Sequence, residues 1–216
     1  MTLRIDIVSD IMCPWCIVGF KQLEQALTAT KITAEIYWHP FELNPDMAAS
    51  GQDLAEHLAE KYGSTPEQSA EVRGRLSSLG EDLGFVFKFN PESRIYNTFQ
   101  AHQLLHWAGE HGVAHALKQA LFEAYFSDGK DMSEIEVLVD EAGKVGLDRG
   151  EARAVLLENR YAHVVREMER FWQSRGITGV PAMIFDSKHL VTGAQGVENY
   201  IKILQRVLQE SVPEKA

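Results

Sequence analysis

The two cysteines of this chain lie three positions apart, in the segment Cys-Pro-Trp-Cys at residues 13–16. Before them, apolar and polar residues alternate from Leu3 to Val8, which predicts a β-strand followed by a turn. After them, apolar residues recur at the three-four spacing of an amphipathic helix, predicted from Pro14 to Thr28. A proline is favourable in the first turn of a helix, where its missing N–H costs nothing. Cys13 is therefore expected at the N-terminus of a helix that directly follows a strand.

That position favours redox chemistry. The unpaired N–H groups and the dipole at a helix N-terminus stabilise a thiolate, and Cys16 lies one turn further along the same helix face. The two thiols can therefore alternate between a dithiol and a disulfide. Half of a zinc site and a pair of inert cysteines stay open as alternatives. A stapling disulfide is less favoured because the loop that it would close is very short, and a structural zinc site usually has a second Cys or His pair.

Charge and hydropathy exclude some classes of partner. The 216 residues include 21 basic and 31 acidic ones, a net charge of −10. Such a surface argues against binding to nucleic acid or to anionic membranes. The first residues lack the apolar core of a signal peptide, and no apolar run approaches the length of a membrane span. We therefore expect a cytoplasmic protein, where reducing conditions make a cysteine pair catalytic more often than structural.

The chain divides into three parts. The first is strand, helix, strand, and the last is a helix over residues 161–175, strands over 181–185 and 189–193, and a helix over 197–208. The middle is almost entirely helical in pattern. We predict an α/β fold in which residues 1–45 and 160–216 form one discontinuous thioredoxin-like domain, with a helical domain of residues 46–159 inserted between them.

Several short signals mark the expected helix ends. Capping-box patterns, in which a helix begins, occur at Thr65, Ser133 and Asp148. Glycines that are expected to end helices are Gly63, Gly112, Gly129 and Gly146.

A proline at the start of a later strand supports the thioredoxin-like fold. A Cys-x-x-Cys at the first strand-to-helix turn is typical of that fold, which also has a proline facing the cysteines. Val180-Pro181 follows a glycine-rich turn and precedes an apolar run, so we expect a cis peptide bond that leaves the Val180 backbone free to pair with an extended substrate. The alternative is an ordinary trans proline at a strand start.

The sequence resembles the DsbA-like branch of the thioredoxin superfamily, and within it the cytoplasmic FrnE-type thiol oxidoreductases. The matching stretches span nearly the whole chain in order: SDIMCPWCIVG, WHPFELNPD, NTFQAH, LFEAYFSDGKDMS, GITGVPAMIF and VTGAQGVENY. The resemblance implies a thioredoxin fold with an inserted helical domain. It also implies that Cys13 is the nucleophile, Cys16 the resolving thiol and Pro181 the cis proline.

The sequence is also similar to 2-hydroxychromene-2-carboxylate isomerases and kappa-class glutathione transferases. Those relatives carry serine at the position of Cys13 and lack the second thiol. Because both cysteines are present here, a glutathione-dependent transferase or isomerase that uses Cys13 alone is the second hypothesis. A third is a non-enzymatic protein that binds peptides or zinc.

The expected reaction needs no cofactor besides the cysteine pair. Cys13 forms a mixed disulfide with a protein or small-molecule substrate, and Cys16 opens or closes the cycle. Glutathione is a candidate co-substrate, and a homodimer is possible. We expect the pKa of Cys13 to lie between about 3.5 and about 7, the values of DsbA and thioredoxin, and nearer the latter. Pro14 and Asp10 are expected to tune this pKa, the charge of Asp10 opposing ionisation.

Other candidates are weaker. Trp15 is either a packing residue or a ring that faces the substrate. Asn97 and His102 are candidates to border the cleft, and Gln195 either lines it or caps the last helix. Two histidine pairs, His102 with His106 and His111 with His115, have a spacing that suits metal, but no third ligand is evident, so we expect polar helix faces and no metal site.

Overall fold

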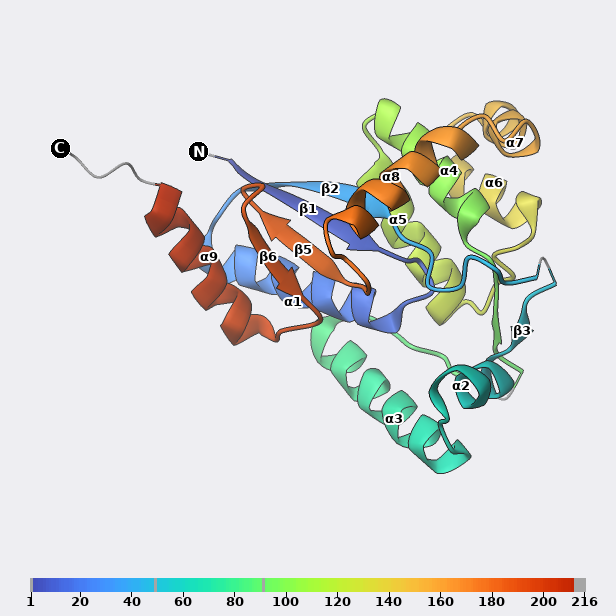
Figure 1. Ribbon diagram of the computed structural model, residues 1–216, viewed down its shortest axis with the longest axis horizontal. Coiled ribbons are helices and arrows are strands. Elements are labelled where there is room, and N and C mark those ends of the chain that lie inside the picture. Colours follow the sequence, from blue (N-terminus) through green and yellow to red (C-terminus); the bar gives the residue numbers. More distant parts are fainter. Residues whose placement is uncertain (1, 49, 91, 212–216) are drawn as a thin grey trace.

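The computed structural model describes residues 2–48, 50–90 and 92–211. Its four-stranded sheet has the order β2-β1-β5-β6 and joins both ends of the chain (Figure 1). The strands are β1 (Leu3–Ser9), β2 (Ala34–Pro40), β5 (Ala182–Phe185) and β6 (His189–Thr192). β1 pairs with β2 in parallel and with β5 in antiparallel, and β6 is antiparallel to β5. This is the predicted strand-helix-strand unit followed by the predicted strand-strand-helix unit.

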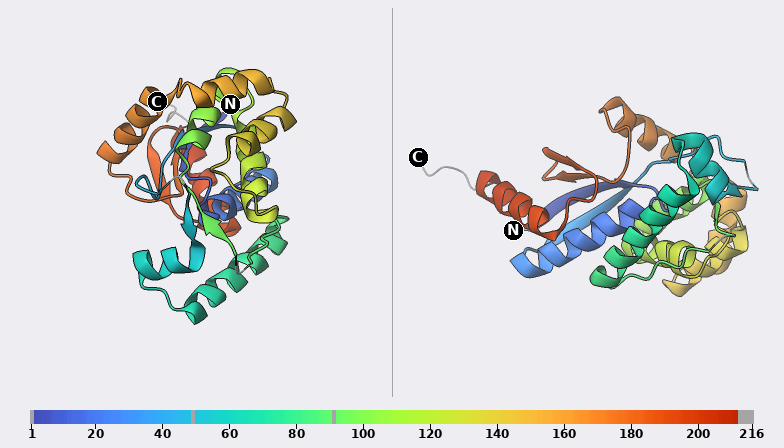
Figure 2. Two further views of the ribbon diagram at one scale, coloured as in Figure 1. Left: turned by 90° about the vertical axis from the view of Figure 1, so that its right-hand side faces the viewer. Right: turned by 90° about the horizontal axis from the view of Figure 1, so that it is seen from below.

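Helices cover both faces of this sheet (Figure 2). On one face lie α1 (Pro14–Thr30) and α9 (Val197–Ser211), which pack against each other. On the other face lies α8 (Ala162–Ser174), which packs against β2. Ile5 and Ile7 of the central strand are completely buried, as expected for a strand with both faces covered.

The remaining helices lie between β2 and α8 in sequence. They are α2 (Leu54–Tyr62), α3 (Pro66–Leu83), α4 (Phe99–Glu110), α5 (Ala114–Phe122), a π-helical turn η1 (Glu123–Ser127), α6 (Ile135–Lys144) and α7 (Arg149–Leu157). Two short strands, β3 (Gln52–Asp53) and β4 (Arg94–Ile95), pair in antiparallel within this insertion. The α/β thioredoxin-like fold with a helical insertion is therefore confirmed.

Most of the predicted helix ends are confirmed. Thr65 forms a complete capping box with Gln68, and Asp148 accepts a hydrogen bond from the Glu151 amide. The prediction at Ser133 is wrong, because α6 begins after Glu134 and the Ser133 hydroxyl donates to Asp131 instead. The four predicted glycines all have positive φ at the ends of helical segments, the conformation that glycine adopts most easily.

The insertion does not form its core alone. Phe85, Phe87, Phe122 and Phe126 of the insertion belong to the same hydrophobic cluster as the residues between the sheet and α1. A second cluster lies among α4, α5, α6 and α7. The domain boundaries at residues 45 and 160 stay a prediction.

In the described ranges, no helix is both long and apolar enough to cross a membrane.

Candidate functional site

Cys13 is the residue that immediately precedes α1, and Cys16 lies in the first turn of that helix. Pro14 occupies the start of the helix as predicted, and the Cys16 amide donates to the Cys13 carbonyl over 3.0 Å. Both sulfurs are free thiols. Cys13 is 4% exposed, whereas Cys16 is completely buried, so the first thiol is the one that a substrate can reach.

The Val180-Pro181 peptide bond is cis, as predicted. The Cys13 Sγ lies 3.6 Å from the Val180 carbonyl oxygen and donates to it. Pro181 is buried, immediately precedes β5, and lies next to Gly19 of α1, where a Cβ would be 3.3 Å from the proline ring. The structure therefore brings Cys13, Cys16, Val180 and Pro181 together from opposite ends of the chain.

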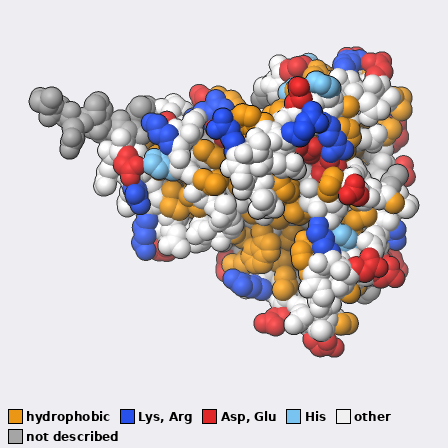
Figure 3. Space-filling model, in the orientation of Figure 1, with side chains coloured by type: hydrophobic (Ala, Val, Ile, Leu, Met, Phe, Trp, Pro, Cys, Tyr) orange, Lys and Arg blue, Asp and Glu red, His pale blue; other side chains and the backbone are white. Residues whose placement is uncertain are grey.

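A cavity of about 440 Å³ opens in front of Cys13. Cys13, Pro14, Trp15 and Val180 form one side of it, and residues of α2, α3, the segment 88–96 and η1 form the others. Hydrophobic side chains gather in the hollow between the end of α1 and α3 (Figure 3). Trp15 is half-buried and lines the cavity, so its ring both packs and faces the hollow, which combines the two predicted roles.

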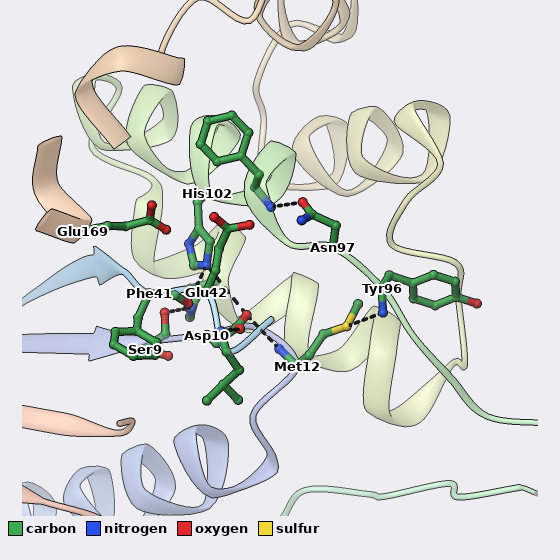
Figure 4. Close-up of polar contacts among 12 residues, drawn as sticks. Ser9, Asp10, Met12, Phe41, Glu42, Tyr96, Asn97, His102 and Glu169 are labelled. Atoms are coloured by element: carbon green, nitrogen blue, oxygen red, sulfur yellow. Dashed lines mark hydrogen bonds and ion pairs between the residues drawn. The ribbon is translucent and has the colours of Figure 1, made fainter. Parts of the chain in front are cut away.

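The carboxylate of Asp10, three residues before Cys13, is buried (Figure 4). It accepts hydrogen bonds from the amides of Leu43, at 2.7 Å, and Met12, at 3.3 Å. The His102 Nε2 lies 3.7 Å from it and 3.1 Å from the Phe41 carbonyl oxygen. Burial raises the pKa of Asp10, but the contacts with His102 and Leu43 outweigh it, so the pKa falls below its usual value and Asp10 carries a charge.

Lys118 of α5 brings a positive charge to the same place. Its side chain is 1% exposed, its Nζ lies 3.5 Å from the Ser9 carbonyl oxygen, and it stands over the rings of Trp38 and Phe122. Burial lowers the pKa of Lys118 to about 8, partly offset by the charges of Cys16 and Asp10.

The two thiols ionise as a pair. The hydrogen bond with Cys16 raises the pKa of Cys13 well above its usual value, and burial and the charge of Asp10 add to this effect. Burial opposes ionisation of Cys16 as well, but the neighbouring Cys13 thiol and Ser9 hydroxyl and the charge of Lys118 lower its pKa. The first proton is therefore lost from the two thiols as a coupled pair, and the resulting negative charge lies on Cys16.

This differs from the prediction that Cys13 itself has the lowered pKa. Lys118 favours a charge on the inner sulfur, whereas Asp10 disfavours a charge on the outer one. The charge of Asp10 raises the pKa of Cys13, in the direction that the sequence predicts.

Comparisons with known proteins agree with this geometry. The family model described as "DSBA-like thioredoxin domain" matches residues 4–205. The chain belongs to this family. In this DsbA-like domain the cavity at Cys13 is thus the candidate active site.

Similar proteins extend over the whole chain. A probable DsbA oxidoreductase from Streptomyces coelicolor is 35% identical, with a TM-score of 0.92 over 99% of this chain and 93% of that one. The uncharacterized protein YwbO of Bacillus subtilis (strain 168) is 26% identical over 205 residues, which are 94% of this chain and 96% of YwbO. The structure of a 2-hydroxychromene-2-carboxylate isomerase is 15% identical, with a TM-score of 0.71 over 99% of this chain and 100% of that one, which shows a shared fold.

Three predicted residues of this DsbA-like domain lie away from the cavity lining. Asn97 accepts a hydrogen bond from the Phe99 amide at the start of α4 and donates to Pro45, so it shapes a loop (Figure 4). His102 contacts Asp10, with its Nε2 3.7 Å from the carboxylate. Gln195 is exposed, and its side chain donates to the Thr192 carbonyl over 2.6 Å, in the turn before α9.

The histidine pairs do not form a metal centre in the part of the chain that the structure describes. There, no group of three His, Cys, Asp or Glu side chains lies close enough to hold an ion. That the protein binds no metal stays a prediction.

Sequence reasoning missed two buried charged groups near the site. The first is Lys118, whose signal was a lysine on the apolar face of α5, next to Leu117 and one turn before Phe122. The second is Glu42, which forms an ion pair with Arg166. Arg166 also forms an ion pair with Glu169 at 2.9 Å. Burial and the charge of Glu169 raise the pKa of Glu42 to about 7, against the opposing effect of Arg166. Nothing near these residues in the sequence indicates that they meet.

Proposed function

We propose that this protein is a thiol–disulfide oxidoreductase of the cytoplasmic FrnE type that works through a mixed disulfide on Cys13. The observation that carries the proposal is the different access of the two thiols: Cys13 lines the cavity and contacts the Val180 carbonyl, while Cys16 is sealed behind it. Such a pair separates attack on the substrate from resolution of the adduct. The similarity to the probable DsbA oxidoreductase from Streptomyces coelicolor supports it.

The reaction begins with the reduced pair. The proton that the two sulfurs share moves to Cys16, and the Cys13 thiolate attacks one sulfur of a substrate disulfide. A Cys13–substrate disulfide forms, and the other half of the substrate leaves as a thiolate. Cys16 gives its proton to the departing thiolate, and the Cys16 thiolate then attacks the Cys13 sulfur, which forms the Cys13–Cys16 disulfide and releases the second half of the substrate as a thiolate. Two electrons pass from the protein to the substrate, and the reverse sequence oxidises a substrate dithiol.

The surrounding groups assist each step. Lys118 stabilises the negative charge on Cys16 just before it attacks the mixed disulfide. The contact between the Val180 backbone and Cys13 supports a role for that backbone in pairing with the substrate chain that carries the reacting sulfur.

The second candidate is a glutathione-dependent isomerase or transferase. The cavity is compatible with it, since about 440 Å³ accommodates a small molecule as well as a peptide side chain. The presence of Cys16 favours the first candidate, because a single nucleophile would suffice for the second.

Replacement of each cysteine distinguishes the two candidates. Reduction of insulin and of a small aromatic disulfide, with dithiothreitol as electron donor, should be lost in Cys13→Ser. Cys16→Ser should form an adduct but turn over slowly. Isomerisation or glutathione conjugation would instead survive Cys16→Ser. Wild-type disulfide turnover in Cys13→Ser, together with its loss in Cys16→Ser, would show that the roles of the two thiols are reversed.

A further inference from the structure

The cavity in front of Cys13 is mainly apolar. Its lining includes the hydrophobic residues Met12, Trp15, Leu43, Leu54, Leu58, Val72, Leu76, Phe89, Ile95, Tyr96, Tyr125 and Phe126. Its volume of about 440 Å³ falls within the range of sites that enclose small organic molecules, roughly 300–1,000 Å³. An apolar or aromatic body would therefore fill it.

The charge of the lining is opposite to that of the protein. The chain has 21 basic and 31 acidic residues, yet the cavity is lined by four basic residues, Arg73, Lys88, Arg94 and Lys130, and by one acidic residue, Glu92. A local excess of positive charge on an acidic protein attracts anions to that site and repels cations from it.

Two of these four cations, Arg73 and Lys88, have no competing partner in the described part of the chain, whereas the other two do. Lys130 pairs with Glu141 at 2.7 Å, and the Arg94 guanidinium donates to the Ser50 carbonyl over 3.0 Å. The side chains of Arg73, on α3, and Lys88, after α3, form no ion pair or hydrogen bond with a described residue. They are therefore available to a ligand.

We propose that this cavity selects small organic disulfides that carry a negative charge beside an apolar or aromatic body, with Arg73 and Lys88 as the residues that recognise the charge. The proposal rests on the proposed function for the attack by Cys13. It goes further by naming the substrate class and the residues that determine specificity. As in the general reaction, the anionic disulfide gains two electrons from the Cys13–Cys16 pair and, with two protons, leaves as two thiols.

The kinetic test compares two aromatic disulfides of similar shape. Dithiobis(nitrobenzoate) is a dianion, and dithiodipyridine is neutral. The ratio of their kcat/KM values is measured for the wild type and for the double variant Arg73→Gln/Lys88→Gln, so that intrinsic reactivity cancels. We expect the ratio to fall about tenfold or more in the variant, a change of about 1.4 kcal/mol in relative transition-state binding. Raised salt should lower the ratio in the wild type and have little effect in the variant.

The matched control is Arg170→Gln/Lys202→Gln. It removes the same two charges from α8 and α9, outside the cavity lining. It should keep the wild-type ratio, which separates a local site from the effect of net charge. An unchanged ratio in the Arg73/Lys88 variant, or an equal fall in the control, would overturn the proposal while the thiol–disulfide function stands.

A binding measurement covers the case in which neither disulfide is turned over through Cys13. Anilinonaphthalene sulfonate is an aromatic anion, and N-phenylnaphthylamine is its uncharged counterpart. In Cys13→Ser the anion should bind more tightly than the neutral probe, and Arg73→Gln/Lys88→Gln should remove that preference. Equal affinity of the two probes in the Cys13→Ser protein would contradict the anion site itself, whatever the fate of the proposed reaction.

Discussion

Lys118 places a positive charge beside the two thiols at a position that water does not reach. With its pKa lowered to about 8, it is still mainly protonated at neutral pH and stabilises the Cys16 thiolate. We expect Lys118→Met to raise the pKa of the first thiol by about one unit and to slow turnover about tenfold at pH 7, with recovery at alkaline pH. Thiolate absorbance at 240 nm against pH measures the first effect. Lys202→Met, on the surface of α9, is the control, and an unchanged thiol titration in Lys118→Met would argue against this role.

The same lysine links stability to pH. Unfolding returns its pKa from about 8 to about 10.5, so the unfolded chain binds more protons between these values. The cost of burying the charge is therefore fully present below pH 8 and is removed as the pH rises to about 10.5. Relative to Lys118→Met, the wild type should gain up to about 3 kcal/mol of unfolding free energy between pH 7 and pH 10.5. Urea unfolding of both proteins at the two pH values measures it, and parallel curves would refute the assignment.

Glu42 gives the stability of the protein the opposite dependence on pH, at lower pH values than Lys118. Its folded pKa of about 7 exceeds the ordinary value of 4.5, so the folded state binds the proton more tightly. Its contribution to the free energy of unfolding is fully present below pH 4.5 and is lost as the pH rises through 7. Glu42→Gln should therefore flatten the stability–pH curve and be more stable than the wild type at pH 8, by about 2 kcal/mol. The control is Glu167→Gln, an exposed residue of α8, which should keep the wild-type slope.

At the scale of single elements, α3 contains two glycines in contrasting surroundings. A Cβ at Gly80 would lie 2.4 Å from the Phe85 carbonyl oxygen and 2.7 Å from the Phe87 ring, whereas a Cβ at Gly74 would meet nothing within 4 Å. Gly80→Ala should therefore destabilise the protein by about 1–3 kcal/mol. Gly74→Ala should stabilise it by up to about 1 kcal/mol, through helix propensity alone. Thermal and urea unfolding of the pair test this, and similar effects of the two substitutions would mean that Phe85 and Phe87 do not pack closely on α3.

The strands and helices that carry the cysteines were predictable because their signals are local. Alternation in β1, the proline at the start of α1 and the cap at Thr65 each lie within a few residues. The failed prediction at Ser133 has the same local pattern, but Asp131 provides a nearer acceptor for its hydroxyl and the helix begins later. A capping motif thus gives the approximate start of a helix without giving its first residue.

The surroundings of the cysteines could not be predicted in the same way, because they depend on contacts between distant parts of the chain. Lys118 reaches Ser9 across more than a hundred residues, and Arg166 meets Glu42 across a similar distance. Asn97 and His102 were expected at the cleft because they lie in a matching stretch, yet their side chains point to a loop and to Asp10. The cysteine pair and Pro181 could be found because the Cys-x-x-Cys spacing and the proline at a strand start are local signals, and a thioredoxin-like fold places such a proline opposite the cysteines.

Across the whole molecule, the helical insertion and the sheet share a core. Leu76, Phe85, Phe122 and Phe126 pack in the same cluster as the α1 residues beside the sheet. We therefore expect one cooperative unfolding transition rather than separate melting of the insertion. Hydrogen exchange of peptides from α1 and from α6, measured across a urea series, should give the same midpoint. A lower midpoint for α6 would show that the insertion unfolds by itself.

The most direct test of the proposed reaction follows the sulfur atoms. Reduced protein is mixed with excess dithiobis(nitrobenzoate), and the products are identified by intact mass and peptide mapping. We expect Cys16→Ser to accumulate one adduct per chain, on Cys13, that dithiothreitol removes. The wild type should instead end as a Cys13–Cys16 disulfide without an adduct. An adduct that persists in the wild type, or one that forms equally fast on Cys16 in Cys13→Ser, would contradict the account.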